Sequence, residues 1–368
     1  MKKRKLLPTG RLLNRWQSLF LSILFVLLAL GTLFMLDISL VESAATFDDP
    51  YYLLKQHLVG LVIAGIFFSL GILVRPKIWI HFGPYAYLFG LVLLLLVFIP
   101  GIGLDLNGAR RWFAIGSFRL QPVEFFKGAL IMFFSGWLHT HKQIVPFLFA
   151  LIFPSIFLLL QPDMGSLLIV LGIAVILFFL AGGKLSTLAT LGGAMIPILL
   201  ILIITSPYRM QRLTSYINPD SDPLGASFHI RQITLALGRG GLWGKGLGNS
   251  NQKYAYIPES TTDSIFAIVA EEVGFVGSVT IILLFLTLFY SGYRIIQTSD
   301  APDAERLLSL GMLSWIMLQT TLNLAAVVGL VPLTGIPLPF FSYGRSSQVM
   351  TLFACAIIIR TGNTTIKS

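Results

Sequence analysis

Long apolar runs recur along this chain and constrain its fold more than any other feature. About 20 consecutive apolar residues are needed for a helix to cross the hydrocarbon core of a membrane. We read ten such runs with soft boundaries: 17–38, 52–74, 79–100, 122–140, 144–161, 164–182, 185–206, 264–290, 307–331 and 338–360. They lack the period-two alternation of a transmembrane barrel. The sequence therefore predicts an all-α polytopic membrane protein with ten transmembrane helices.

The composition supports a membrane protein and argues strongly against a soluble enzyme. Hydrophobic residues make up 55% of the chain and charged residues only 11%, whereas soluble domains carry about 25% charged residues. A soluble protein of this length would have too few charges to cover its surface. The abundance of Leu, Ile, Val and Phe also excludes a disordered chain.

The distribution of charge predicts the orientation. Basic residues crowd the segment before the first run: Lys2, Lys3, Arg4, Lys5, Arg11 and Arg15. Positive segments stay in the cytoplasm, and this first run is too long for a cleaved signal peptide. We expect a cytoplasmic tail at 1–16, one ten-helix domain at 17–360 and a cytoplasmic tail at 361–368. The net charge of +10 then follows from topology and requires no nucleic-acid partner.

The outer connections are expected to carry the chemistry, because loops commonly do. Residues 207–263 form a single extracytoplasmic loop between spans 7 and 8, far longer than the 2–8 residues usual between bundled helices. The short outer loop 101–121 breaks the charge rule with Arg110, Arg111 and Arg119.

Several ionisable residues fall inside the spans, where each costs about 2.5–3.5 kcal/mol at the helix centre. Glu124 and Lys127 are spaced i,i+3 and can pair on one helix face. The spacing is equally consistent with a structural ion pair and with a functional one. Asp163 lies at an outer helix entrance, and Glu271 and Glu272 lie two turns into the eighth span.

The end of the long loop offers a candidate carboxylate. Asp263 follows Thr261 and Thr262 directly before an apolar helix, so one interpretation is a helix cap. The other is a proton acceptor, kept ionised by the helix N-terminus. Upstream, residues 227–238 are spaced as an interfacial amphipathic helix in which His229 is a polar residue and not a metal ligand.

Glycines between Gly238 and Gly248, with Arg239 and Lys245, form a weak signal for anion binding. Basic residues, glycines and a few carboxylates at an outer membrane surface suit an anionic lipid headgroup, particularly a diphosphate. A transferase and a transporter both fit this pattern. The apolar inner halves of the spans favour the enzyme.

Six motifs spread over much of the chain resemble the SEDS family (shape, elongation, division, sporulation) of polytopic peptidoglycan glycosyltransferases. They are residues 107–112 (NGARRW), 121–127 (QPVEFFK), 161–165 (QPDMG), 208–212 (YRMQR), 258–266 (PESTTDSIF) and 334–344 (TGIPLPFFSYG). The segment Gly246–Lys253 is similar to the division-type FtsW members more than to the elongation-type RodA members.

Four positions depart from the family pattern. Val123, Thr261, Ser264 and Arg345 stand where the family usually has Ser, His, Phe and Gly. None of these changes removes the acidic position Asp263.

The resemblance implies polymerisation of lipid II into β-1,4 glycan strands on the outer face of the cytoplasmic membrane, with inversion at the sugar. Asp263 matches the family's catalytic Asp, as base or essential carboxylate. The candidates for holding the diphosphate and headgroup are Arg110, Arg111, Lys127, Arg209 and Arg212, with Glu124 orienting Lys127. The supporting candidates are Asp163, Gln232, Glu259 and Ser342.

The resemblance also implies partners and leaves alternatives open. A class B penicillin-binding protein transpeptidase is the expected partner, along with other membrane proteins of the division machinery. A divalent cation, Mg²⁺ or Mn²⁺, would suit carboxylates beside a diphosphate, but the sequence identifies no ligands for it. The alternatives are a lipid II flippase, an elongation-type polymerase and a non-catalytic scaffold.

Overall fold

The computed structural model describes residues 13–47, 49–106, 109–115, 118–184, 186–187, 190, 192–193, 204–218, 227–252 and 261–363. In chain order the helices are α1 (Arg15–Thr46), α2 (Tyr52–Leu73), α3 (Pro76–Leu96), α4 (Pro122–Thr140), α5 (Ile144–Leu160), α6 (Met164–Leu180), α8 (Pro207–Ile217), α9 (Phe228–Gly240), α10 (Ile265–Gln297), α11 (Asp303–Val327) and α12 (Arg345–Thr361). The predicted span 185–206 falls mostly outside the described residues.

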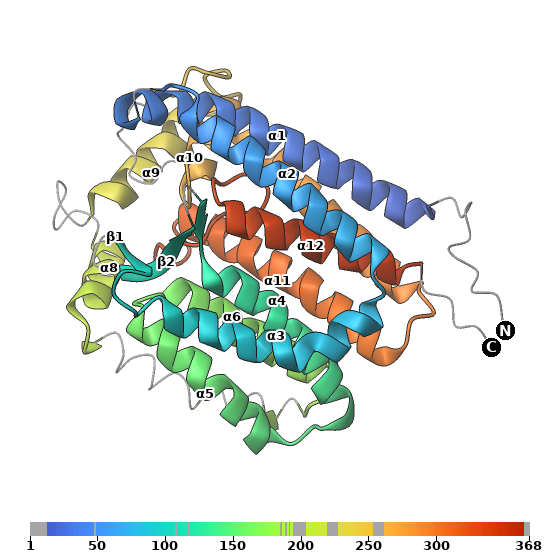
Figure 1. Ribbon diagram of the computed structural model, residues 1–368. Helices are drawn as coiled ribbons and strands as arrows, with labels where there is room; N and C mark the ends of the chain where they lie inside the picture. The colour runs from blue at the N-terminus through green and yellow to red at the C-terminus, as the bar shows by residue number, and fades with distance from the viewer. Residues whose placement is uncertain are drawn as a thin grey trace.

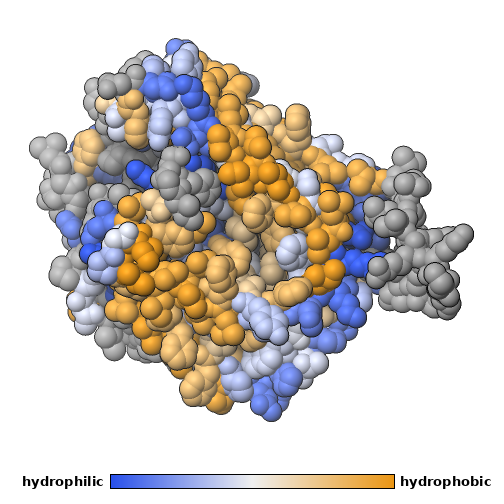
Figure 2. All heavy atoms as spheres, viewed as in Figure 1, coloured by the Kyte–Doolittle hydropathy of each residue, from blue (hydrophilic) through white to orange (hydrophobic). Residues whose placement is uncertain are grey.

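The helical membrane fold is confirmed. Five described helices, α1, α2, α3, α10 and α11, are long and apolar enough to cross a membrane, and α5 and α6 are shorter apolar helices. These helices lie together in one bundle (Figure 1). A broad band of apolar side chains crosses the middle of the face shown in Figure 2, as a lipid-facing surface requires.

A small antiparallel sheet replaces the predicted loop at 101–121. Its strands are β1 (Gly103–Leu106), β2 (Ala109–Ile115) and β3 (Phe118–Leu120), in the order β1-β2-β3. Strands this short show too few alternations to be recognised from sequence. The sheet gathers with α8 and α9 at one end of the bundle, the left end in Figure 1.

A contact between the first and last helices brings the start of α1 and the end of α12 to the same end of the bundle. The start of α1 is closed by a capping box in which the side chain of Asn14 accepts from the backbone of Gln17 at 2.8 Å. The Gln17 amide also donates to the Ile359 carbonyl near the end of α12, at 3.0 Å. The start of α12 therefore lies at the opposite end, beside the sheet.

Helix α12 is the most enclosed helix of the bundle. Its residues from Ser346 to Ile359 are all buried, and it packs along α2 so closely that a Cβ on Gly71 would lie 2.6 Å from the Ala356 side chain. The sequence predicted a span from residue 338, but α12 begins at Arg345. Proline at 337 and 339 removes backbone donors and disfavours helix there.

Helix α10 is broken at Gly274 (φ 69°, ψ −169°), and the loop after α9 docks into the break. Backbone hydrogen bonds join the two segments: Lys245 to Glu271 (3.1 Å), Gly246 to Glu272 (3.0 Å), Phe275 to Gly241 (2.9 Å) and Val276 to Leu242 (3.1 Å). The donors of Lys245 and Gly246 thus point at helix carbonyls. The glycine-rich segment fastens α10, which corrects the expectation that it cradles an anion.

Candidate functional site

A cavity of about 700 Å³ opens at the end of the bundle that carries the sheet. Its walls come from β2, β3, α8, α9, the residue after α1, the starts of α2 and α12, and the loops before α4, α6, α10 and α12. The charged side chains that line it among the described residues are Arg111, Arg119, Arg212, Arg345, Asp163 and Asp263. Four guanidinium groups face two carboxylates, so the lining favours an anionic ligand.

Asp263 lies in this cavity, half-buried, in the turn that precedes α10. The cap interpretation is wrong, because the N-cap residue of α10 is Ser264, and its side chain makes no capping hydrogen bond. The Oδ1 atom of Asp263 accepts weak contacts from the hydroxyls of Thr262 (3.4 Å) and Ser264 (3.5 Å). The carboxylate therefore lies at the cavity wall and is not used to close a helix.

The backbone around Asp263 is held by the loop that precedes α12. The side chain of Asn323, buried on α11, donates to the carbonyl of Asp263 (2.8 Å) and to that of Ile336 (2.7 Å). The hydroxyl of Ser342 donates to the carbonyl of Thr262 and accepts from the backbone of Leu338. Ser342, a predicted supporting residue, thus contacts the turn and lies outside the cavity lining.

Arg212 and Asp263 flank Gly335. A Cβ placed on Gly335 would lie 4.0 Å from Arg212 Nη1 and 4.0 Å from Asp263 Oδ2. Arg212 also donates to the carbonyl of Leu333 at 2.9 Å, which fixes its side chain on the same loop. Gly335 has a φ of 71°, a backbone conformation that favours glycine. The structure therefore brings one predicted cation beside the predicted carboxylate.

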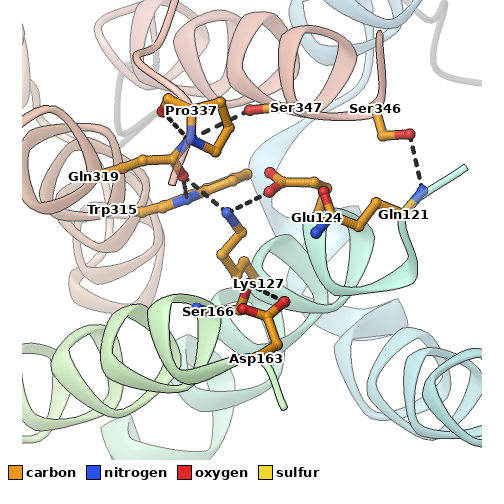
Figure 3. Close-up of polar contacts among 10 residues, drawn as sticks. All are labelled: Gln121, Glu124, Lys127, Asp163, Ser166, Trp315, Gln319, Pro337, Ser346 and Ser347. Carbon is orange, nitrogen blue, oxygen red and sulfur yellow. Dashed lines mark hydrogen bonds and ion pairs between the residues drawn. The ribbon is translucent and has the colours of Figure 1, made fainter. Parts of the chain in front are cut away.

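Arg111 and Asp163 also line the cavity, but both hold the turn between α5 and α6. Arg111 donates to the carbonyls of Gln161 (3.1 Å) and Pro162 (2.5 Å). Asp163 caps α6 by accepting from the backbone (3.1 Å) and hydroxyl (2.8 Å) of Ser166, as Figure 3 shows for the hydroxyl. These hydrogen bonds hold the side chains of Arg111 and Asp163 in the cavity wall.

Arg119 and Arg345 line the cavity but were not selected as site residues from the sequence. The sequence did contain a signal for Arg119, because a basic residue in a short outer loop departs from the positive-inside rule. Arg345 is only 7% exposed and donates to the side chain of Gln56 at 2.5 Å. Its stem packs on α2, where a Cβ on Gly60 would lie 2.9 Å from its Cγ.

Glu124 and Lys127 are not part of the cavity lining, and Figure 3 shows their contacts. The Lys127 ammonium is 2.8 Å from Glu124 Oε1 and 2.8 Å from Gln319 Oε1, and it lies 5.0 Å from the centre of the Trp315 ring. Gln319 in turn donates to the carbonyl of Pro337 at 3.1 Å. This buried pair joins α4 to α11 and, through Gln319, supports the loop before α12, which lines the cavity.

The remaining predicted residues lie away from the lining. Arg110 is on the exposed side of β2 and pairs with Asp105 at 3.5 Å. Arg209 donates to a carbonyl at the end of α5 at 3.2 Å. Gln232 is half-buried on α9. Glu259 lies outside the described residues.

The cavity also contains His229, which comes from α9 and was expected to be an interfacial polar residue. Its Nε2 atom lies 2.7 Å from the hydroxyl of Ser264. Within the described ranges, no group of three or more His, Cys, Asp or Glu side chains could hold a metal ion. Mg²⁺ is often bound by one or two carboxylates plus substrate phosphates. Asp163 and Asp263 are the two carboxylates of the lining that fit this mode.

Comparison with known proteins finds matches over nearly the whole chain. A family model described as a cell cycle protein, FTSW_RODA_SPOVE, matches residues 17–366. Stage V sporulation protein E of Bacillus subtilis is 37% identical over 352 residues, covering 93% of this chain and 95% of that protein. The probable peptidoglycan glycosyltransferase FtsW of Nitrosococcus halophilus is 38% identical over 351 residues, covering 91% and 89%.

Solved structures show the same fold. A chain in a peptidoglycan synthase complex that coordinates polymerization and crosslinking superposes with a TM-score of 0.75 at 24% identity, covering 93% of this chain and 96% of that one. The rod shape determining protein RodA of Thermus thermophilus gives a TM-score of 0.67 at 24% identity, covering 94% and 97%.

Proposed function

Since this chain belongs to the FTSW_RODA_SPOVE family of cell cycle proteins, we propose that it is a peptidoglycan glycosyltransferase that polymerises lipid II into β-1,4 glycan strands. Several of its relatives are named as probable peptidoglycan glycosyltransferases. The observation that carries the proposal is the placement of Asp263 beside Arg212 in a cavity where arginines outnumber carboxylates.

The proposed reaction is a direct displacement that inverts the sugar. The acceptor hydroxyl gives its proton to the Asp263 carboxylate while its oxygen bonds to the anomeric carbon of the donor. The bond from that carbon to the diphosphate oxygen breaks, and the electron pair leaves on the diphosphate. Arg212 and Arg119 stabilise the departing negative charge, because they line the cavity as cations.

The cavity end of the bundle is proposed to face outward. The helix α12 runs from the cavity to the end where α1 begins, so this orientation leaves both chain ends in the cytoplasm. A role in division is proposed, supported by the relatives named FtsW. A class B penicillin-binding protein is proposed as partner, because a similar chain belongs to a synthase complex that couples polymerization to crosslinking.

A divalent cation is proposed to enter with the substrate diphosphate, and Asp163 is the carboxylate of the lining that would hold it, because Asp263 serves as the base. When bound, it would neutralise charge on the leaving diphosphate. Such an ion would not remain on the purified protein. We therefore expect polymerisation to stop with chelator and to return when Mg²⁺ or Mn²⁺ is added, with no metal detected in the protein by elemental analysis.

The test is polymerisation of purified lipid II by the full chain with its transpeptidase partner in detergent. Asp263→Asn keeps the shape of the side chain and removes the base, so the glycan product should fall at least about 100-fold. Asp49→Asn is the matched control, because Asp49 is an exposed carboxylate that pairs with Lys55 outside the cavity. Equal product from the wild type and Asp263→Asn would overturn the proposal.

The same variant addresses the flippase alternative. Lipid II translocation is measured in vesicles containing Asp263→Asn protein, with protein-free vesicles as the blank. Translocation by the polymerase-inactive variant would favour the transporter. Translocation at the blank level supports the enzyme.

A further inference from the structure

A second cavity, of about 350 Å³, lies where α4 and α6 end and α11 begins. Both α4 and α6 start beside the catalytic cavity, at Gln121 and Asp163 respectively. Their far ends therefore place the second cavity on the other side of the membrane. It belongs to a different membrane leaflet and takes no part in the proposed glycosyl transfer.

The lining of this second cavity is basic. Lys142 is exposed at its mouth and Arg306 is half-buried, while Asp303 is the acidic residue among the described lining. Arg306 donates to the side-chain oxygen of Gln297 at 3.2 Å. Neither Lys142 nor Arg306 forms an ion pair with a carboxylate among the described residues. With His139 neutral, the lining carries one net positive charge.

The Lys142 ammonium is seated over a glycine turn. A Cβ on Gly182 would lie 3.2 Å from Lys142 Nζ, and Gly182 has a φ of 89° that favours glycine. The turn after α6 thus leaves room for the ammonium beside the cavity.

Apolar surface continues directly from the cavity. Leu180 lines it and is 40% exposed, and its neighbour Phe179 is 49% exposed. Both end the apolar helix α6, so they lie where the hydrocarbon meets the headgroups. A ligand here meets fixed cations at one end and lipid-facing side chains at the other.

We propose that this cavity binds the headgroup of an anionic phospholipid of the phosphatidylglycerol type. Lys142 and Arg306 hold the phosphodiester, a glycerol hydroxyl donates to the Asp303 carboxylate, and an acyl chain lies along Leu180. The single net positive charge matches a headgroup of one negative charge. Asp303 disfavours a bare phosphate, because its carboxylate would repel a second negative charge.

The experiment measures binding of phosphatidylglycerol to the purified full chain by native mass spectrometry and by the rise in melting temperature with added lipid. The parallel probes are phosphatidylethanolamine, phosphatidylcholine and inorganic phosphate. We expect phosphatidylglycerol to bind at least about tenfold more tightly than either zwitterionic lipid. The double variant Lys142→Gln, Arg306→Gln should lose at least about tenfold in that affinity.

Two further variants test whether lipid binding depends on the residues that line this cavity. Lys184→Gln removes an exposed lysine beyond α6 that does not line the cavity, and it should bind phosphatidylglycerol like the wild type. Asp303→Asn should weaken discrimination against inorganic phosphate. Equal binding of zwitterionic lipids, equal stabilisation by free phosphate, or unchanged affinity in a folded double variant would each overturn the proposal.

Discussion

The side-chain amide of Asn323 lies 2.8 Å from the main-chain carbonyl oxygen of Asp263. The same amide is 2.7 Å from the carbonyl of Ile336, so one buried group ties the turn before α10 to the loop before α12. The cavity is formed between these two segments. The position of the proposed base is therefore set by a residue that does not line the cavity.

Replacing Asn323 by Asp removes both donors while keeping the shape of the side chain. The carbonyls of Asp263 and Ile336 then lose their donor and face the added negative charge, at a cost of at least about 1–3 kcal/mol each. We expect kcat for lipid II polymerisation to fall about 10- to 100-fold, with the protein still helical by circular dichroism. A folded Asn323→Asp variant with wild-type kcat would show that this tie does not position Asp263.

The buried pair Glu124–Lys127 allows a structural role to be separated from a functional one. Lys127→Met leaves Glu124 charged and unpaired, which should cost about 3–5 kcal/mol of unfolding free energy. Adding Glu124→Gln removes the unpaired charge and should restore most of the melting temperature. If the double variant regains stability and also polymerises lipid II, the pair is structural; a stable but inactive double variant would contradict that interpretation.

Gly165 allows α6 to approach the loop that carries Gly335. A Cβ at Gly165 would lie 2.4 Å from the carbonyl oxygen of Thr334, so Gly165→Ala should displace the loop and cost about 1–3 kcal/mol. Polymerisation should fall with it. Gly238→Ala on α9 is the control, because its Cβ meets nothing within 4 Å, and it should be neutral or stabilise by up to about 1 kcal/mol.

Arg345 should act on substrate binding more than on turnover. Arg345 lines the cavity as a cation and cannot act as a base. Arg345→Gln should therefore raise KM for lipid II roughly 3- to 10-fold with little change in kcat. Arg239→Gln, an exposed arginine on α9 outside the cavity lining, is the matched control. Steady-state kinetics distinguish an effect on substrate binding from an effect on turnover. A fall in kcat at unchanged KM would contradict a binding role.

Helices with continuous apolar runs were predictable because burial in lipid requires such runs. The predicted span 122–140 coincides with α4, and 144–161 and 164–182 end within two residues of α5 and α6. The prediction failed where the chain leaves the membrane: α1 continues to Thr46, beyond the predicted end at 38. Apolar content fixes the membrane crossing but not how far a helix continues past it.

The chemical nature of the site was predictable from the sequence, but the set of residues that line it was less so. Asp263 and Arg212 share the cavity, as their motifs suggested. Lys127 could not be placed from the sequence, because an i,i+3 pair can face either a cavity or a neighbouring helix. The position of Arg345 depends on a contact with Gln56, 289 residues away in the chain. No local pattern records such a contact.

The break at Gly274 has a consequence for how the chain between α9 and α10 can vary. The segment 241–246 supplies backbone partners on both sides of that break, from Glu271 to Val276. An inserted or deleted residue there would shift every one of these pairings out of register. This stretch is therefore expected to keep a fixed length among related chains.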